Sequence, residues 1–289
     1  MERDPDLAFD GENFLVVWAE GAFSGEYRVR ASRVTKEGVV VDTGIHFGSG
    51  HPFETKPKVA FDGHRYLGVW LQKTQQPYGL FGRFITTDCR PQGDVITIRE
   101  LSFDYDLLFD IAFLDGRYLI VWGDPTFQGD EDILGQLVAR DGSLIGSVID
   151  IATGNEFQSD PQVIRSGNYF LVVWDQEGTI MARWLDRSGQ LIGASFPLSS
   201  LTPYQRENPA ITSGGGRLLG VWMEYRGGDY DIYGNLDHEI SIAEGDSRSE
   251  VEIEPGIYDL LGRRVDKMAR PGIYFILTGE KKSKVVLIR

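Results

Sequence analysis

Cysteine is nearly absent from this sequence: Cys89 is the only one in 289 residues, so no disulfide can form within the chain. Basic residues are outnumbered, with 29 lysines and arginines against 43 aspartates and glutamates and a formal net charge of −14. Nucleic-acid binding needs clustered positive charge, so we expect no nucleic-acid partner. No run reaches the roughly eighteen apolar residues of a membrane helix, so we expect no transmembrane segment.

A tryptophan at the end of an apolar stretch returns at a nearly fixed interval. The first copy is Asn13-Phe14-Leu15-Val16-Val17-Trp18. The five tryptophans lie 52, 52, 52 and 48 residues apart, at Trp18, Trp70, Trp122, Trp174 and Trp222. A period of this length is typical of repeat architectures.

Each copy carries the signals of four antiparallel strands. Glycine turns such as Asp10-Gly11 and Asp62-Gly63 separate the first strand from the second. The second strand is apolar throughout, as in residues 118–122, so it must be covered on both faces. Four strands in about fifty residues make one propeller blade. The sequence therefore predicts an all-β fold, a five-bladed β-propeller.

The period stops near residue 245, which predicts two parts. Residues 1–245 form the propeller, and residues 246–289 form a small C-terminal β tail. The tail holds three short strand-like pieces joined by turns, which are too few to bury a core alone. We expect them to form β structure separate from the ring.

The tail resembles the C-terminal sorting domain of cargo exported by the type IX secretion system. The match lies in Tyr258-Asp259-Leu260-Leu261-Gly262-Arg263-Arg264-Val265, in Pro271-Gly272-Ile273-Tyr274-Phe275 and in Lys284-Val285-Val286 with Arg289. The resemblance implies a secreted or cell-surface protein whose tail engages the secretion machinery. Residues 1–5 contain no signal peptide, so we expect a trimmed leader. The alternative is a tail that caps the propeller as a hairpin.

A polar residue stands two positions after every tryptophan. In a closed ring these residues would share one face, as acceptors for sugar hydroxyls or a cation. Tyr225 and Arg226 beside them suit sugar stacking. In the alternative, each polar side chain bonds backbone groups of the adjacent loop. The five are Glu20, Gln72, Asp124, Gln176 and Glu224.

We expect no cofactor, with calcium as the one possibility at Asp130-Glu131-Asp132 or Asp229-Tyr230-Asp231. Neither segment has the full ligand run of a calcium loop. No His-Cys cluster, phosphate-binding loop or nucleophile elbow occurs in the sequence. Metal enzymes, nucleotide enzymes and serine hydrolases therefore have no support.

These observations predict a non-catalytic binding module that recognises a glycan or an extracellular protein through the polar residues after the tryptophans. One alternative is a glycoside hydrolase, which needs two nearby carboxyls at the channel mouth. Asp6, Asp110 and Asp160 near the starts of first strands are its candidates, with Glu20 or Glu224 as partners. A second alternative is a structural spacer in a surface protein.

Overall fold

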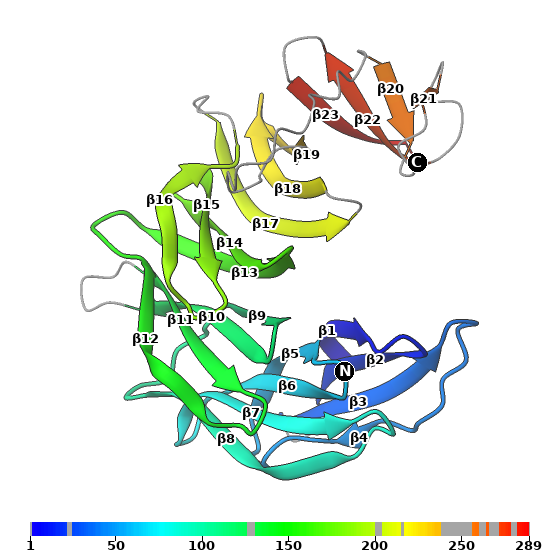
Figure 1. Cartoon of the computed structure of the whole chain (residues 1–289), viewed down its shortest axis with the longest axis vertical. Helices are drawn as coiled ribbons and strands as arrows, with labels where there is room; N and C mark the ends of the chain where they lie inside the picture. The colour runs from blue at the N-terminus through cyan, green and yellow to red at the C-terminus, as the bar shows by residue number, and fades with distance from the viewer. Residues whose placement is uncertain are drawn as a thin grey trace.

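The computed structural model of the chain describes residues 2–21, 25–125, 131–199, 204–214 and 217–237, and strand segments between 256 and 288. The described residues contain strands and no helix, so no helix among them could cross a membrane. Figure 1 shows five blades that follow one another around a common axis. The predicted five-bladed β-propeller is confirmed.

Each of the first four blades is a four-stranded antiparallel sheet, and the strands are hydrogen-bonded in chain order. Blade 1 comprises β1 (Glu2–Phe9), β2 (Asn13–Gly21), β3 (Tyr27–Thr35) and β4 (Ile45–His46). Blade 2 comprises β5 (Glu54–Phe61), β6 (Arg65–Gln72), β7 (Tyr78–Thr86) and β8 (Pro91–Leu101). Blade 3 comprises β9 (Phe109–Leu114), β10 (Arg117–Pro125), β11 (Glu131–Ala139) and β12 (Leu144–Ala152).

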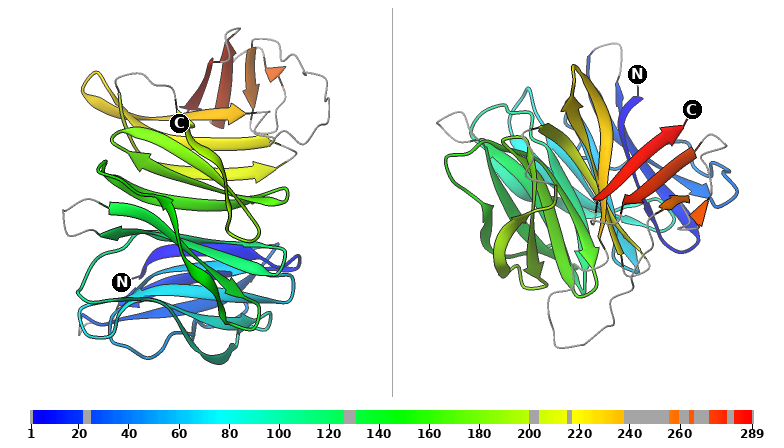
Figure 2. Two further views of the ribbon diagram at one scale, coloured as in Figure 1. Left: turned by 60° about the vertical axis from the view of Figure 1, so that its left-hand side comes forward. Right: turned by 90° about the horizontal axis from the view of Figure 1, so that it is seen from above.

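Blade 4 comprises β13 (Gln158–Ser166), β14 (Tyr169–Gln176), β15 (Thr179–Asp186) and β16 (Leu191–Pro197). Blade 5 comprises β17 (Gln205–Gly214), β18 (Arg217–Arg226) and β19 (Asp229–Asp237). The sequence predicts four strands in every blade, and the stretch after β19 in which the fourth would lie, from residue 238, is outside the described residues. The views in Figure 2 show the blades stacked face to face.

The proline of the repeat lies inside the first strand, and a bulge precedes it. Asp4, Lys56, Asp160 and Asn208, each directly before a proline, have positive φ of 50 to 53°. The register of the first and second strands shifts at the same place in these four blades. The bulge bends these four first strands at their inner ends, and the bulged residues line a cavity that all five blades share.

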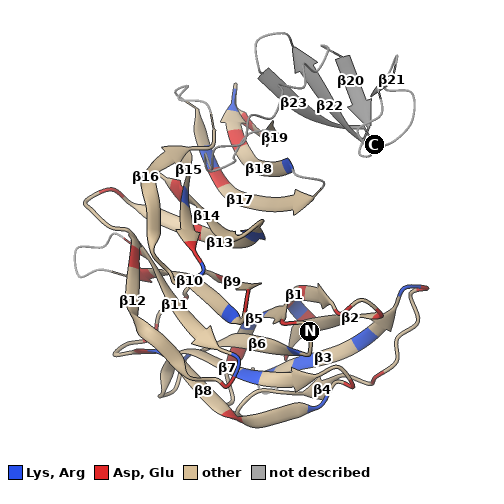
Figure 3. Ribbon diagram, in the orientation of Figure 1, with Lys and Arg blue, Asp and Glu red and all other residues tan. Residues whose placement is uncertain are grey.

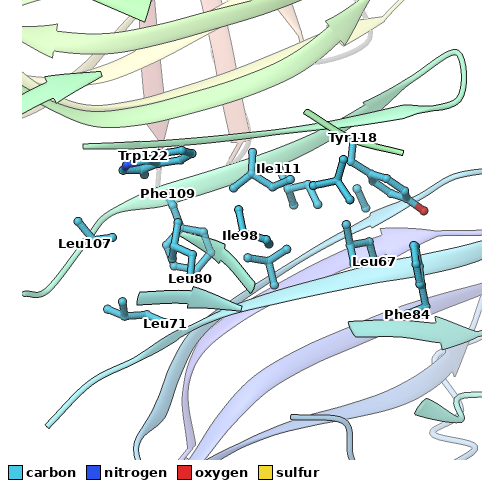
Figure 4. Close-up of a cluster of buried hydrophobic side chains, with 14 of the residues drawn as sticks. Leu67, Leu71, Leu80, Phe84, Ile98, Leu107, Phe109, Ile111, Tyr118 and Trp122 are labelled. Carbon is cyan, nitrogen blue, oxygen red and sulfur yellow. The ribbon is translucent and has the colours of Figure 1, made fainter. Parts of the chain in front are cut away.

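The apolar second strands of blades 2 to 4 are covered on both faces, as predicted, because each of these blades packs between two others. Trp70, Trp122 and Trp174 are fully buried, and each belongs to a core cluster shared with the preceding blade. Figure 4 shows the cluster between blades 2 and 3, where Trp122 and Phe109 face Leu80. The repeated tryptophan is therefore the main contact from one blade back to the one before it.

The small residue at the centre of each third strand allows this close packing. A Cβ added to Gly135 would stand 2.9 Å from Cδ1 of Ile151 and 3.3 Å from Cδ1 of Leu119. One added to Gly82 would stand 3.2 Å from Cδ1 of Ile98. Any larger residue would displace core side chains at these positions, where packing is already dense.

The fourth strand of blade 1 is the shortest of the blade strands that the structure describes. It is β4, Ile45–His46, with two residues. Upstream of it, the carboxylate of Asp42 binds the backbone and guanidinium of Arg33, with distances of 2.8 to 3.0 Å. The same segment also pairs with the β3 backbone at the bridge between Val34 and Val40, so the side-chain contacts of Asp42 add to a short stretch of backbone pairing.

The C-terminal strands form one further antiparallel sheet. Its strands are β20 (Gly256–Asp259), β21 (Arg264–Val265), β22 (Gly272–Thr278) and β23 (Lys282–Ile288), in the order β21-β20-β22-β23. No strand of this sheet is hydrogen-bonded into a blade among the described strands. The linker predicted at residues 245–249 lies outside the described residues, so the boundary between the two parts stays a prediction.

Candidate active site between blades 4 and 5

Four of the five polar residues after the tryptophans accept a hydrogen bond from the indole of their own tryptophan. The donor is Nε1 each time, and the acceptor lies two residues later on the same strand. The pairs are Trp70 with Gln72 (3.5 Å), Trp122 with Asp124 (2.9 Å), Trp174 with Gln176 (3.2 Å) and Trp222 with Glu224 (3.0 Å). These side chains therefore satisfy a buried donor in every blade from 2 to 5.

Blade 1 departs from this pattern. Glu20 instead receives a hydrogen bond from Nε of Arg30 at 2.9 Å. Nε1 of Trp18 is buried without a partner among the described residues. The hydrogen bond between the tryptophan and the polar residue two positions later, present in blades 2 to 5, is therefore missing from the described residues of blade 1.

Blade 5 carries the most buried version of the pattern. The carboxylate of Glu224 receives hydrogen bonds from Trp222, from Nε of Arg206 at 2.8 Å and from Arg226. Burial alone would raise the pKa of Glu224, but these three donors hold it below its usual value. Arg206 and Glu224 are both buried, so they form an interior ion pair.

The sequence analysis offered the alternative that each polar side chain bonds the backbone of the adjacent loop. The structure shows a similar structural role, but the partner is the indole of the tryptophan. None of the five residues lines either of the two cavities described below. Tyr225 stacks on Tyr230 with ring centroids 5.1 Å apart, and Arg226 lies over the rings of Tyr204 and Tyr233. Ligand binding by these residues stays a prediction.

Removing one such acceptor should destabilise the propeller. Gln176→Leu leaves the buried indole N–H of Trp174 without a partner, and we expect a loss of about 1–3 kcal/mol in the free energy of unfolding. Urea denaturation measures this loss. The control is Gln190→Leu, an exposed position in the same blade, where we expect a change within about 0.5 kcal/mol. Equal losses in both variants would contradict a role for the indole bond.

The axial channel opens into a cavity of about 310 Å³ that all five blades line. The bulged residues before the prolines stand at its wall, together with their neighbours. They are Asp4 and Pro5, Lys56 to Lys58, Leu108 and Phe109, Asp160 and Gln162, and Asn208 and Pro209. Of the three hydrolase candidates in the sequence analysis, only Asp160 lies here.

Asp6 and Asp110 instead bind the next blade along the chain. Oδ2 of Asp6 accepts the backbone N–H of Val59 at 2.8 Å, and Oδ2 of Asp110 accepts that of Val163 at 2.9 Å. Burial raises the pKa of Asp6, and it raises the pKa of Asp110 to about 6. Lys58, 3.9 Å from Asp110, opposes the effect in both. These two aspartates tie successive blades together, and neither lines the two cavities.

A larger cavity of about 670 Å³ lies between blades 4 and 5. Its lining is rich in carboxylates and carries two aromatic side chains. The lining residues are Phe157, Ser159, Asp160, Asp175, Glu177, Gly178, Thr179, Tyr204, Gln205 and Glu207. Asp160 lines this cavity as well as the axial channel, so the two cavities meet at its side chain.

Short loops leave these carboxylates accessible. Glu177 and Gly178 alone connect β14 to β15, with φ of 48° and 78°, as a two-residue hairpin turn requires. The corresponding loops of blades 1 and 2 have five residues each, 22–26 and 73–77. In blade 5, Gly227 and Gly228 again form a two-residue turn. The cavity thus lies between the two blades that have the shortest loops of this kind.

Three of the carboxylates interact electrostatically. Burial raises the pKa of Asp175 to about 6, and the nearby charges of Asp160 and Glu207 add to the increase. Burial also raises the pKa of Asp160, again with a contribution from Glu207. Backbone N–H groups partly offset both effects; that of Gly178 donates to Oδ1 of Asp175 at 3.0 Å. Such coupled, shifted carboxyls in a cleft are typical of catalytic sites.

Sequence reasoning missed Asp175, Glu177 and Glu207. Asp175 stands one position after the tryptophan, where the other blades have Ala19, Leu71, Gly123 and Met223. The irregular interval after Trp174 was the available signal, because it marks the short loop beside the cavity.

Metal binding finds no support in the part of the chain that the structure describes. Among those residues no three or more His, Cys, Asp and Glu side chains are grouped so that they could hold an ion. Asp130, in one of the two predicted calcium segments, lies outside the described residues. Figure 3 shows basic residues interspersed among acidic ones on the blades.

Comparison with known proteins gives similarity in structure alone. No family model and no curated protein matches the sequence. A thermostable family-43 glycoside hydrolase is 12% identical with a TM-score of 0.50, over 81% of this chain and 89% of the other. The GH43 endo-arabinanase from Bacillus licheniformis is 14% identical with a TM-score of 0.45, over 81% and 93%. An exo-1,5-α-L-arabinanase from a bovine ruminal metagenomic library is 10% identical with a TM-score of 0.45, over 81% and 92%.

The prediction of a non-catalytic binding module is wrong, since the fold is similar to that of the family-43 glycoside hydrolase with a TM-score of 0.50. The comparison favours the alternative that the sequence analysis held in second place. The physical reason for the error is that the repeated polar residues serve their tryptophans. At these identities the likeness establishes the five-bladed fold, and the catalytic assignment depends on this chain's own carboxylates.

Proposed function

We propose that the protein is a glycoside hydrolase that acts in the cavity between blades 4 and 5. The observation that carries the proposal is the set of three coupled carboxylates, Asp160, Asp175 and Glu207, in a cavity of about 670 Å³. Glycosidic bond cleavage needs one carboxyl that donates a proton and a second that is ionised. Unequal environments for neighbouring carboxyls provide this division of roles.

Asp175 is the proposed general acid. Its pKa of about 6, raised by burial and by two neighbouring charges, keeps it partly protonated in mildly acidic solution. Asp160 is the proposed ionised carboxylate, acting as nucleophile or as general base. Its place at the junction of the cavity and the channel puts it where a sugar chain can pass.

Aromatic side chains supply the sugar-binding surface of the proposal. Phe157 and Tyr204 line the cavity and are 46% and 39% exposed. Exposed rings beside polar groups stack on the apolar face of a sugar while the polar groups orient its hydroxyls. A polysaccharide bound along the cavity would pass between these rings and the carboxylates.

Substrates with different leaving groups test the role of Asp175. The dinitrophenolate of a dinitrophenyl glycoside is a good leaving group that departs without protonation. The sugar alkoxide that leaves when a polysaccharide is cleaved must be protonated by the general acid. Asp175→Asn should therefore lose hydrolysis of arabinan, xylan or xyloglucan and retain cleavage of the dinitrophenyl glycoside of the same sugar. Asp160→Asn should lose both. Equal loss on both substrates in Asp175→Asn would remove its assignment as the acid.

The pH profile is a further expected result. Because Asp175 must be protonated, activity should fall as pH rises above about 6. Glu207→Gln removes a charge that raises the pKa of Asp175, so the alkaline side of the profile should move to lower pH. Rates measured between pH 4 and pH 8 test this shift. An unchanged profile in Glu207→Gln would contradict the coupling.

We further propose export to the cell surface or medium through the tail. The support is the resemblance of three tail pieces to the type IX sorting domain, and the proposed partner of the tail is the secretion machinery. Polysaccharide hydrolysis outside the cell fits this location. Removal of residues 246–289 should retain the protein in the cells of a bacterium that has this system, as fractionation would measure. Equal export without the tail would contradict the proposal.

A further inference from the structure

A buried group of charged residues lies beside the cavity between blades 4 and 5. The carboxylate of Glu224 accepts hydrogen bonds from Arg206 and from Arg226. Arg206 and Glu224 are 0% and 1% exposed, and none of the three residues lines the cavity. A guanidinium has more N–H donors than one carboxylate accepts. Arg206 can therefore bond further acceptors around it.

The further acceptors of Arg206 are two backbone carbonyls in the cavity wall. Its Nη1 donates to the carbonyl of Tyr204 at 3.1 Å and to that of Gly178 at 3.4 Å. The backbone N–H of Arg206 donates to the same Gly178 carbonyl at 3.2 Å. Tyr204 and Gly178 both line the cavity. Arg206 on blade 5 thus holds the turn of blade 4 that carries Gly178.

This turn also bonds the proposed general acid. The N–H of Gly178 donates to Oδ1 of Asp175 at 3.0 Å. The turn packs closely on β17, since a Cβ added to Gly178 would stand 3.2 Å from Cα of Gln205. One glycine therefore carries the bond to Asp175 and the bonds from Arg206. A movement of the turn away from Arg206 would change the hydrogen bond to the acid.

Arg226 holds the aromatic part of the cavity wall. Its guanidinium lies 4.3 Å from the ring centre of Tyr204 and 4.0 Å from that of Tyr233. A cation over a ring face is attracted to it, and Glu224 fixes the position of this cation. The ring of Tyr204, which is 39% exposed, is thereby held at the edge of the cavity.

We propose that Arg206 and Arg226 are positioning residues of the candidate active site. Arg206 fixes the turn that bonds Asp175, Arg226 fixes the ring of Tyr204 for sugar stacking, and Glu224 anchors both guanidiniums. This inference deepens the proposed hydrolase function and rests on it. In this role the buried group acts on the sugar only through the residues that it holds.

Arg206→Lys tests the first half of the proposal. Lysine keeps the charge beside Glu224 but lacks the planar fork that reaches the two carbonyls as well. The N–H of Gly178 lowers the pKa of Asp175, against burial and the charges of Asp160 and Glu207. A loosened turn should therefore move the alkaline side of the kcat profile to higher pH and lower kcat by up to about 10²-fold.

The control for this change is Arg183→Lys. Nη1 of Arg183 donates to the carbonyl of Ile151 at 2.7 Å, so it too joins two blades, but at the junction of blades 3 and 4. Both lysine variants should lower Tm, and only Arg206→Lys should move the pH profile. A profile that stays in place in Arg206→Lys, or moves equally in Arg183→Lys, would overturn the role of Arg206.

Arg226→Met tests the second half. Methionine removes the cation from the Tyr204 ring, so KM for the polysaccharide should rise about threefold to tenfold while kcat and the pH profile stay unchanged. Tyr204→Ala should raise KM as well, and the double variant should add little to the larger single effect. Additive effects on KM would show that Arg226 does not act through Tyr204.

A titration without substrate separates this inference from the proposed function. Carbon-13 NMR can follow the carboxyl of Asp175, which is identified by the signal that Asp175→Asn loses. Arg206→Lys should raise the pKa of this group above the wild-type value of about 6. An unchanged pKa in an enzyme that hydrolyses polysaccharide would overturn the inference alone. Wild type without hydrolysis would contradict the proposed function, and the titration would still decide whether Arg206 positions the turn at Asp175.

Discussion

Asp175→Asn should lower polysaccharide hydrolysis by about 10²–10⁴-fold, because a positioned general acid contributes a factor of that size. The amide has the shape of the carboxyl and keeps an oxygen that can accept the N–H of Gly178, so the hairpin between β14 and β15 should persist. Initial rates of reducing-end release with polysaccharide in excess measure the effect.

The matched control is Asp141→Asn. Asp141 is a carboxylate in an exposed turn of blade 3, where it binds the backbone and hydroxyl of Ser143. We expect its activity to stay within about twofold of the wild type, because surface substitutions away from a site change little. If Asp175→Asn were as active as Asp141→Asn, the cavity between blades 4 and 5 would not be the active site.

Glu224→Ala should give the largest loss of stability, about 3–5 kcal/mol, because it leaves a buried guanidinium without its counter-charge. Arg206 is 0% exposed and donates to Glu224 at 2.8 Å. The same change removes the acceptor of the buried indole of Trp222. Guanidinium denaturation at neutral pH would measure the loss.

The same position in blade 1 is the control for this change. Glu20 and Arg30 form an ion pair at 2.9 Å, but both side chains are more than 30% exposed. Glu20→Ala should therefore cost at most about 1 kcal/mol. Equal costs at the two positions would contradict the account of a buried pair in blade 5.

The pH dependence of stability has a definite sign at Glu224. Its pKa in the folded protein lies below the ordinary value of 4.5. Its contribution is therefore present above pH 4.5 and is lost as the pH falls through the lower, folded-state pKa. Wild type should lose stability in acid more steeply than Glu224→Ala does.

The fold followed from features that every blade needs. A tryptophan every 48 to 52 residues, a glycine turn and a small residue in the third strand predict the blades because packing imposes the same demands on each copy. Gly135 illustrates this, since a side chain there would meet Ile151 and Leu119. Such constraints are local and periodic, so a single sequence exposes them.

The candidate site could not be predicted in the same way. Gln176 was predicted to bind a ligand because a polar residue recurs at its position in every blade. In the structure this residue accepts the hydrogen bond from the indole of Trp174. Its neighbour Asp175 is an acid at a position where the other blades have apolar residues or glycine. Asp160 comes near it through the pairing of β13 with β14, and Glu207 comes near it through the packing of blade 5 on blade 4. The candidate catalytic residues therefore differ from the residues at the same positions of the other blades. Which side chains they approach depends on the three-dimensional packing.

The most direct test of the hydrolase proposal is reducing-end release from a polysaccharide panel at pH 5 to 6. Wild type, Asp160→Asn, Asp175→Asn and Asp141→Asn would be compared. Their Tm values would be measured first, to show that each variant is as stably folded as wild type. We predict release by wild type and by Asp141→Asn from at least one polysaccharide, and none from that substrate by the two cavity variants. Folded wild type that releases no sugar from any member of the panel, or cavity variants as active as wild type, would contradict the proposal.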